Sequence, residues 1–175
     1  MQTLSLAACA LALASGCASV PPAAISELAP SGKLRAAINY GNPILAARHA
    51  TTGEVSGVSI DLARELARRL GVPVEFVPYA AAGRVVEGVK TKSWDIAFVA
   101  IDPARAVDIA YSPPYVVIEG AYMVRNDSPI RANAEVDRPG VRVAVGRGSA
   151  YDLYLTRELK AATIVPSRWS IVAFP

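Results

Sequence analysis

The sequence has few of the side chains that build metal and redox sites. It contains one histidine, His49, and two cysteines, Cys9 and Cys17, among 175 residues. Both cysteines fall within the first 17 positions, so the rest of the chain cannot assemble a histidine and cysteine cluster for zinc. It cannot form an internal disulfide either, and its stability must come from an apolar core.

Aromatic and charged residues are also sparse, at 7% and 19%, whereas 53% of the residues are hydrophobic. This hydrophobic share argues against a disordered chain. The 18 basic and 15 acidic residues leave a net charge of +3, and both signs are interspersed after residue 25. We expect no nucleic-acid partner, because no basic block or alternation of basic and aromatic residues occurs. No apolar run of about 18 residues follows the N-terminus, which excludes a polytopic membrane protein.

The N-terminus has the pattern of an export signal. An apolar run over residues 4–14 has the length of a secretory h-region and ends on small residues. Ala14-Ser15-Gly16-Cys17 resembles a bacterial lipobox, in which the cysteine is lipidated and becomes the mature first residue. The sequence predicts a signal peptide over residues 1–17, with a lipid anchor at Cys17 that would tether the protein to a membrane. The alternative for this run is a buried, alanine-rich helix.

After a proline-rich linker expected over residues 18–31, strand and helix patterns alternate. Strands are expected over residues 34–38, 72–77 and 96–101, and helices over residues 59–70 and 80–92. In the first helix, apolar residues recur at helical spacing, and Gly71 stands where a C′ glycine ends a helix. This order predicts a parallel sheet with right-handed crossovers, and we expect residues 32–120 to form a first α/β lobe.

A second unit is expected over residues 121–175. Its patterns indicate a strand over 120–124, a polar loop over 126–139, a strand over 141–145 and a helix from about 150 to 159. Gly146-Arg147-Gly148 follows that last strand, but Tyr151 stands where the dinucleotide fingerprint needs a third glycine. No G-x-S-x-G elbow supplies a serine for a triad with His49, so we expect that histidine in a loop.

Two features are suited to binding an anion. Asp102-Pro103 is a typical helix start, which places Arg105 in a first turn at the carboxyl edge of the sheet, where α/β proteins bind ligands. An arginine fork there can hold a carboxylate through two parallel hydrogen bonds. The alternative is a surface arginine paired with Asp102 or Asp108. The second feature is Gly148-Ser149-Ala150, whose backbone N–H groups open the later helix, although an ordinary capped helix has the same pattern.

Several segments occur in an order that is similar to that of family 3 extracellular solute-binding proteins. They are Gly57-Val58-Ser59-Ile60-Asp61-Leu62-Ala63-Arg64-Glu65-Leu66, Trp94-Asp95-Ile96-Ala97, Arg105, and Tyr111-Ser112-Pro113-Pro114-Tyr115, continued by residues 140–145 and Gly148-Ser149. The chain resembles the periplasmic amino-acid-binding components of ABC importers over about residues 32–160. The resemblance implies a periplasmic-binding-protein type II fold, α/β in class, in which two lobes with parallel or mixed sheets close around a ligand.

The resemblance also implies a set of ligand-binding residues. Arg105 matches the arginine that binds the ligand α-carboxylate, and Asp102 stands where serine or threonine is typical. Ser149 and Ala150 match the second-lobe helix start that meets the same carboxylate, and Asn39 and Asn42 lie in the loop that usually lines the cleft. Asn42 and Ala81 also replace aromatic residues that often pack on the ligand, which leaves the ligand class open.

As a whole, the resemblance implies a periplasmic, monomeric binding protein with no enzymatic activity, cofactor or metal. It would capture a small carboxylate, an amino acid or close analogue, and deliver it to an ABC transporter permease. Family members continue past this point, so we expect a C-terminally truncated chain with an incomplete second lobe. The alternatives are a non-functional remnant, a ligand-sensing module, and an enzyme similar to cyclohexadienyl dehydratases, for which Glu119 would be the acid to watch.

Overall fold

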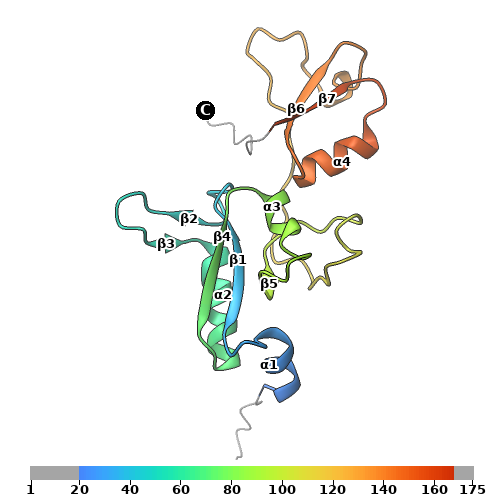
Figure 1. Ribbon diagram of the computed structural model, residues 1–175. Helices are drawn as coiled ribbons and strands as arrows, with labels where there is room; N and C mark the ends of the chain where they lie inside the picture. Colours follow the sequence, from blue (N-terminus) through green and yellow to red (C-terminus); the bar gives the residue numbers. More distant parts are fainter. Residues whose placement is uncertain (1–19, 168–175) are drawn as a thin grey trace, which may run out of the picture.

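The computed structural model describes residues 20–167 as two α/β lobes (Figure 1). The expected signal peptide and the lipid anchor at Cys17 lie outside the described residues. The elements in chain order are α1 Pro22–Leu28, β1 Leu34–Asn39, β2 Ala47–Arg48, β3 Val55–Ser56, α2 Val58–Leu70, β4 Val74–Tyr79, α3 Ala82–Glu87, β5 Ile96–Ala97, η1 Asn133–Glu135, β6 Arg142–Gly146, α4 Ala150–Glu158 and β7 Thr163–Ser167. Within residues 20–167, no helix is both long and apolar enough to cross a bilayer.

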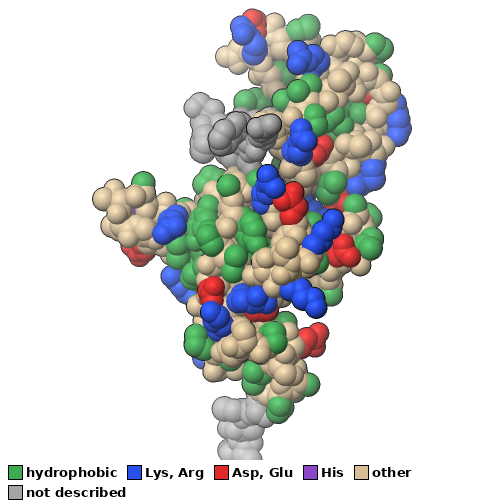
Figure 2. All heavy atoms as spheres, in the orientation of Figure 1, with side chains coloured by type: hydrophobic (Ala, Val, Ile, Leu, Met, Phe, Trp, Pro, Cys, Tyr) green, Lys and Arg blue, Asp and Glu red, His purple; other side chains and the backbone are tan. Residues whose placement is uncertain are grey.

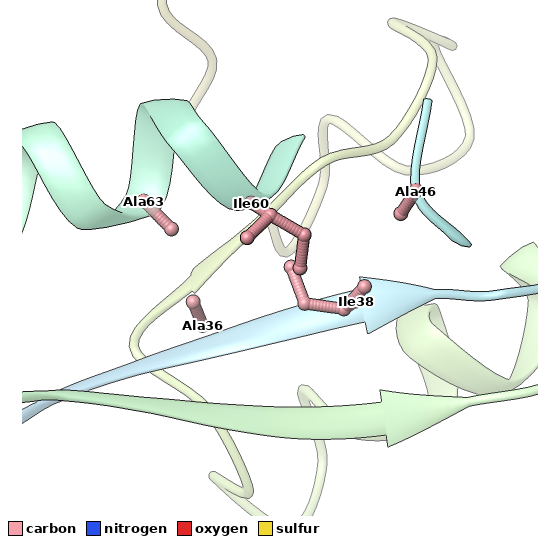
Figure 3. Packing of buried hydrophobic residues seen from close by; sticks show 5 residues of the cluster. All are labelled: Ala36, Ile38, Ala46, Ile60 and Ala63. Atoms are coloured by element: carbon pink, nitrogen blue, oxygen red, sulfur yellow. The ribbon is translucent and has the colours of Figure 1, made fainter. Parts of the chain in front are cut away.

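The first lobe is built on a three-stranded parallel sheet in the order β4-β1-β5. The parallel sheet predicted from the alternation of strands and helices is therefore confirmed. β1 is its central strand, and Leu34 and Ile38 are fully buried there. Figure 3 shows Ile60 of α2 pointing toward Ile38, with Ala36, Ala46 and Ala63 around them. Burial of each large aliphatic side chain contributes about 1.5–3 kcal/mol, so this contact anchors α2 on the sheet.

The helix α2 begins and ends at glycines. Gly57 precedes it with a φ of 116°, and Gly71 follows it with a φ of 70° in the left-handed region, where its N–H bonds to the carbonyls of Ala67 and Arg68. The helix and its glycine end are as predicted. Because α2 starts at the carboxyl end of β1 and runs back along the sheet, it leaves that edge open for the loops that follow β1, β4 and β5.

Two expected strands are shorter or absent. β5 pairs with β1 only at Ile96 and Ala97, whereas a buried strand was expected over residues 96–101, and Ile101 is 56% exposed. Residues 120–124 form no strand, although their apolar pattern predicted one. Residues 98–101 and 120–124 make no ladder with a strand among residues 20–167, so neither segment extends a sheet. The helix expected over residues 80–92 forms only as α3, followed by turns.

Part of the expected linker is a helix. α1 falls within residues 18–31, and Ile25 and Leu28 pack against the buried cluster of Leu34, Ala67 and Leu70. This differs from the linker prediction, because these two apolar side chains cover the amino end of β1 rather than leaving the segment in solvent.

The second lobe contains a two-stranded parallel sheet, β6-β7, and α4 connects the two strands along the chain. Val143 and Val145 of β6 pack with Leu155 of α4 and with Val136 from the preceding loop. The strand and the helix expected here are confirmed. β6 leads directly into the loop that carries Ser149, which brings this loop to the carboxyl end of its own sheet.

Candidate ligand-binding site

The turn after β5 positions Arg105. Asp102 Oδ1 accepts a hydrogen bond from the Ala104 N–H at 2.9 Å, and the Asp102 carbonyl accepts from the N–H groups of Arg105 and Ala106 at 3.0 Å. Asp102 therefore accepts hydrogen bonds as the predicted N-cap does. A series of turns follows over residues 103–108, instead of the helix that was expected. Arg105 lies in the first of these turns.

Arg105 is buried, with 4% of its surface exposed. Its Nη1 donates to the Ala100 carbonyl at 3.0 Å, and its Nη2 donates to the Gly148 carbonyl at 2.8 Å. Burial disfavours the charged form and lowers the pKa of the guanidinium, although Tyr111 and Asp102 oppose this. Within the described part of the chain, neither Asp102 nor Asp108 accepts a hydrogen bond from this side chain, so its direct partners are carbonyls. A guanidinium has five N–H donors, and three of them remain for a ligand.

Asp102 is instead bound from the other lobe. Arg157 of α4 donates from Nη2 to Asp102 Oδ2 at 3.0 Å and from Nη1 to Oδ1 at 3.4 Å. The carboxylate is 4% exposed and the Arg157 side chain 42% exposed. Burial raises the pKa of Asp102, but the hydrogen bonds from Arg157 and the Ala104 N–H outweigh it and hold the pKa below its usual range.

The start of α4 faces this turn. Ser149 is the N-cap, and its Oγ accepts from the Asp152 N–H at 3.1 Å, while the Gly148 N–H donates to Asp152 Oδ2 at 2.7 Å. Ala150 is the first helical residue. The N–H groups of Ala150 and Tyr151 have no acceptor within residues 20–167. They are unused donors at the positive end of the helix dipole.

The two lobes approach each other at a pair of glycines. A Cβ on Gly83 of α3 would lie 3.1 Å from the Arg147 carbonyl oxygen and 3.4 Å from the Gly148 Cα. Gly148 has a φ of 69°, and a Cβ there would lie 3.1 Å from the Gly83 Cα. The backbones are therefore in direct contact, next to the Arg105 bond to Gly148.

A cavity of about 680 Å³ adjoins these contacts. It is lined by Ala81, Gly83, Arg84, Val86, Glu87, Ala104, Arg105, Arg147, Gly148 and Leu153. The structure thus brings Arg105 together with the loop before Ser149 and Ala150. No group of three or more potential metal-ligating side chains occurs among residues 20–167.

The two asparagines expected at the cleft do not line this cavity. Asn39 Oδ1 accepts from the Gly41 N–H at 3.0 Å, and Asn42 Oδ1 accepts from the Ile44 N–H at 3.3 Å. Both amide oxygens stabilise turns in the loop after β1.

Sequence reasoning missed three residues that join the lobes, namely Gly83, Arg147 and Arg157. Gly146-Arg147-Gly148 was considered only as a nucleotide motif, whereas its small residues permit a close approach of two backbones. Arg157 lies 55 residues from its partner Asp102, and no local pattern indicates such a pair.

The sequence pattern that defines bacterial extracellular solute-binding proteins of family 3 matches residues 34–168. The chain belongs to this family. The match includes all three sheets, the β2-β3 pair among them, and every site residue described above.

Solved structures of similar proteins agree with this assignment. The ancestral amino acid-binding protein AncCDT-1, a precursor of cyclohexadienyl dehydratase, is 28% identical with a TM-score of 0.68, over 82% of this chain and 64% of that one. ArgBP from T. maritima, in a mutant form, is 25% identical with a TM-score of 0.60, over 83% and 64%. A binding component of an ABC transporter from Wolinella succinogenes DSM 1740, complexed with lysine, is 23% identical with a TM-score of 0.61, over 79% and 60%, and supports the fold alone. The chain therefore spans less than two thirds of the length of these proteins.

Proposed function

We propose that this family 3 protein captures a small carboxylate, an amino acid or a close analogue, for an ABC importer. In this proposal it acts as a periplasmic monomer, is held at the membrane through Cys17, and passes its ligand to a permease. AncCDT-1, which is 28% identical to this chain, is described as an amino acid-binding protein, and this supports an amino acid as the ligand.

The observation that carries the proposal is the state of Arg105. It is a buried guanidinium, it lines the cavity, and it bonds only to carbonyl oxygens among residues 20–167. A buried guanidinium bonded to neutral carbonyls is costly, Asp102 offsets only part of this cost, and an anion that enters the cavity relieves it further. A ligand carboxylate is planar and accepts two parallel bonds from an arginine fork.

The partners of Arg105 also suggest how binding couples to closure. Ala100 belongs to the first lobe and Gly148 to the second, so the guanidinium is held at the junction of the lobes. A carboxylate on the free N–H donors of Arg105 would lie near the unused N–H groups of Ala150 and Tyr151. Bonds from both lobes to one ligand favour the closed state and exclude water from it.

The test is a thermal melt and a calorimetric titration of the purified chain with a panel of amino acids and small carboxylates. A ligand at 100 times its Kd adds about 2.7 kcal/mol to stability, which shifts the midpoint by several degrees. Arg105→Ala should weaken binding by roughly tenfold to a hundredfold, since charge-assisted bonds contribute about 1.5–3 kcal/mol. Arg105→Lys should also weaken it, because a point charge cannot reproduce the planar fork.

Two results of these measurements would contradict the proposal. Binding that survives Arg105→Ala unchanged would show that the carboxylate lies elsewhere. A chain that binds nothing on the panel and melts without a ligand shift would contradict the transport function and favour a remnant.

The same panel addresses the enzymatic alternative, which the description of AncCDT-1 as a dehydratase precursor raises. Glu119 is exposed and does not line the cavity. We therefore expect binding without turnover of prephenate or arogenate. Release of product by the parent chain would overturn this expectation.

A further inference from the structure

We propose that Arg157 and Asp102 form a latch, which holds the two lobes closed and keeps the turn of Arg105 in place. This inference rests on the proposed function, because the latch would control closure around the same cavity. Neither Arg157 nor Asp102 lines that cavity. The latch therefore acts on a bound molecule through the position of the lobes and not through direct contact.

The ion pair of the latch differs from the others because it joins the lobes. Figure 2 shows acidic side chains next to basic ones at several places on the visible face, so ion pairing by itself is common in this protein. Among residues 20–167, however, each of the other ion pairs connects two residues of the same lobe. Separation of the lobes would remove Arg157 from a carboxylate that is only 4% exposed, and this opposes opening.

A second bond crosses the same boundary in the opposite direction. Arg105 of the first lobe donates from Nη2 to the Gly148 carbonyl of the second lobe at 2.8 Å. Arg157 of the second lobe donates from Nη2 to Asp102 of the first lobe at 3.0 Å. In Figure 1, α4 lies on the side of the second lobe that faces α3. Because the Asp102 carbonyl accepts from the Arg105 N–H at 3.0 Å, Arg157 holds the turn that presents Arg105, and it is a positioning residue.

The latch stabilises closure whether or not the cavity is filled. A binding protein whose closed form is more populated binds more tightly, because the apparent Kd is the intrinsic Kd divided by the fraction of closed molecules. Truncation of one partner of a hydrogen-bonded charge pair across a buried boundary mainly speeds dissociation. Loss of the latch should therefore expand the chain and speed ligand release, while the order of preference among ligands stays the same.

Small-angle X-ray scattering of the chain without added ligand tests the latch directly. The radius of gyration, extrapolated to zero protein concentration, should be larger for Arg157→Gln than for the parent, with circular dichroism showing that both are folded. Arg157→Lys keeps a cation and should restore most of the parent value. Arg138→Gln is the matched control, because Arg138 is an exposed arginine that pairs with Glu135 inside the second lobe. An equal radius of gyration in the parent and Arg157→Gln overturns the proposal.

Calorimetry and stopped-flow release with L-arginine, L-glutamate and L-alanine give a second readout. Arg157→Gln should weaken each probe that binds by about threefold to tenfold, through faster release. Asp102→Asn keeps a side-chain oxygen for the Ala104 N–H and should have the same effect, and the double variant should add little to either.

The results distinguish this inference from the function on which it rests. A changed order of preference among the probes, or losses that add fully in the double variant, would contradict the latch alone. Unchanged affinity in Arg105→Ala, or no binding of any probe, would contradict the proposed function, and the scattering of the ligand-free chain would still decide whether the latch exists.

Discussion

Gly83 and Gly148 determine how closely the two lobes approach. A side chain on either glycine would occupy the space that the opposite backbone fills, with contacts of 3.1 Å in both directions. Gly83 lies at the second position of α3 and has no positive φ, so its lack of a side chain serves the contact rather than the backbone conformation. Gly148 serves both purposes, since its φ is 69°. This makes Gly83 the position that tests the contact by itself.

Gly83→Ala should weaken ligand binding several-fold without lowering the stability of the chain. Alanine is the better helix former by about 0.5–1 kcal/mol, so the free energy of unfolding should stay equal or rise. The added methyl group, however, would hold the Arg147 carbonyl away and hinder closure. Calorimetric titration and urea unfolding of the same variant measure the two effects separately. Unchanged affinity would show that the bound form does not need this contact.

At the scale of elements, α2 depends on Gly57. A Cβ there would lie 2.5 Å from the Leu45 carbonyl oxygen and 2.9 Å from its carbon, both rigid backbone atoms, and the φ of 116° is strained for any other residue. The loop of residues 42–46 therefore lies directly against the start of the helix. Since Ser59 N–H donates to the same Leu45 carbonyl at 3.1 Å, loop and helix are joined at this point.

Gly57→Ala should destabilise the chain by about 2 kcal/mol or more, because it adds a backbone collision to the cost of the positive φ. Gly140→Ala is the control, since its φ is 85° but a Cβ would meet nothing within 4 Å. That variant should lose only about 1 kcal/mol from backbone strain. Urea unfolding of both gives the difference. Equal losses would mean that the loop moves away from α2 without cost.

The elements also show where sequence reasoning works. Residues 34–38, 59–70 and 141–145 bury their apolar side chains within one local unit, so their periodicity was sufficient to predict β1, α2 and β6. The segment at 120–124 has the same apolar character but forms no strand, although Tyr122 packs against the cluster of Val143 and Val145 in β6. Periodicity reports which side chains seek burial, whereas a strand also needs a partner that the local sequence does not reveal. The same holds for the site. Asp102 and Arg105 could be predicted from the local Asp102-Pro103 pattern. Arg157 and Gly83 could not, because their partners lie far away in the sequence.

At the scale of the whole molecule, the ion pair of Asp102 and Arg157 joins the two lobes. The Asp102 carboxylate of the first lobe is nearly buried, and its charge is balanced by the Arg157 guanidinium of the second lobe. Removing Arg157 leaves Asp102 buried, with the Ala104 N–H as its remaining hydrogen-bond donor among residues 20–167. Because Arg157 is 42% exposed, water can replace part of what is lost, and we expect a cost of about 1–3 kcal/mol for Arg157→Ala.

This cost should depend on pH in one direction. The pKa of Asp102 is lowered in the folded chain, so the pair stabilises the protein above the unfolded value of about 3.9 and loses this contribution as the pH falls through the folded value. The difference in unfolding free energy between parent and Arg157→Ala should therefore be full at pH 6–7 and shrink below about pH 4. Urea unfolding of both proteins across this pH range measures the difference. Alanine is used because it does not lower the helix propensity of α4.

Arg125→Ala is the control for this series, because its pair with Asp127 is exposed and lies within one loop. Exposed pairs of this kind contribute little, so we expect no measurable change at any pH. A loss in Arg157→Ala that stayed constant from pH 7 to pH 3 would mean that Arg157 acts through packing of its aliphatic stem. A loss that follows the titration of Asp102 would identify the pair as the electrostatic link between the lobes, on the same turn that presents Arg105 to the ligand.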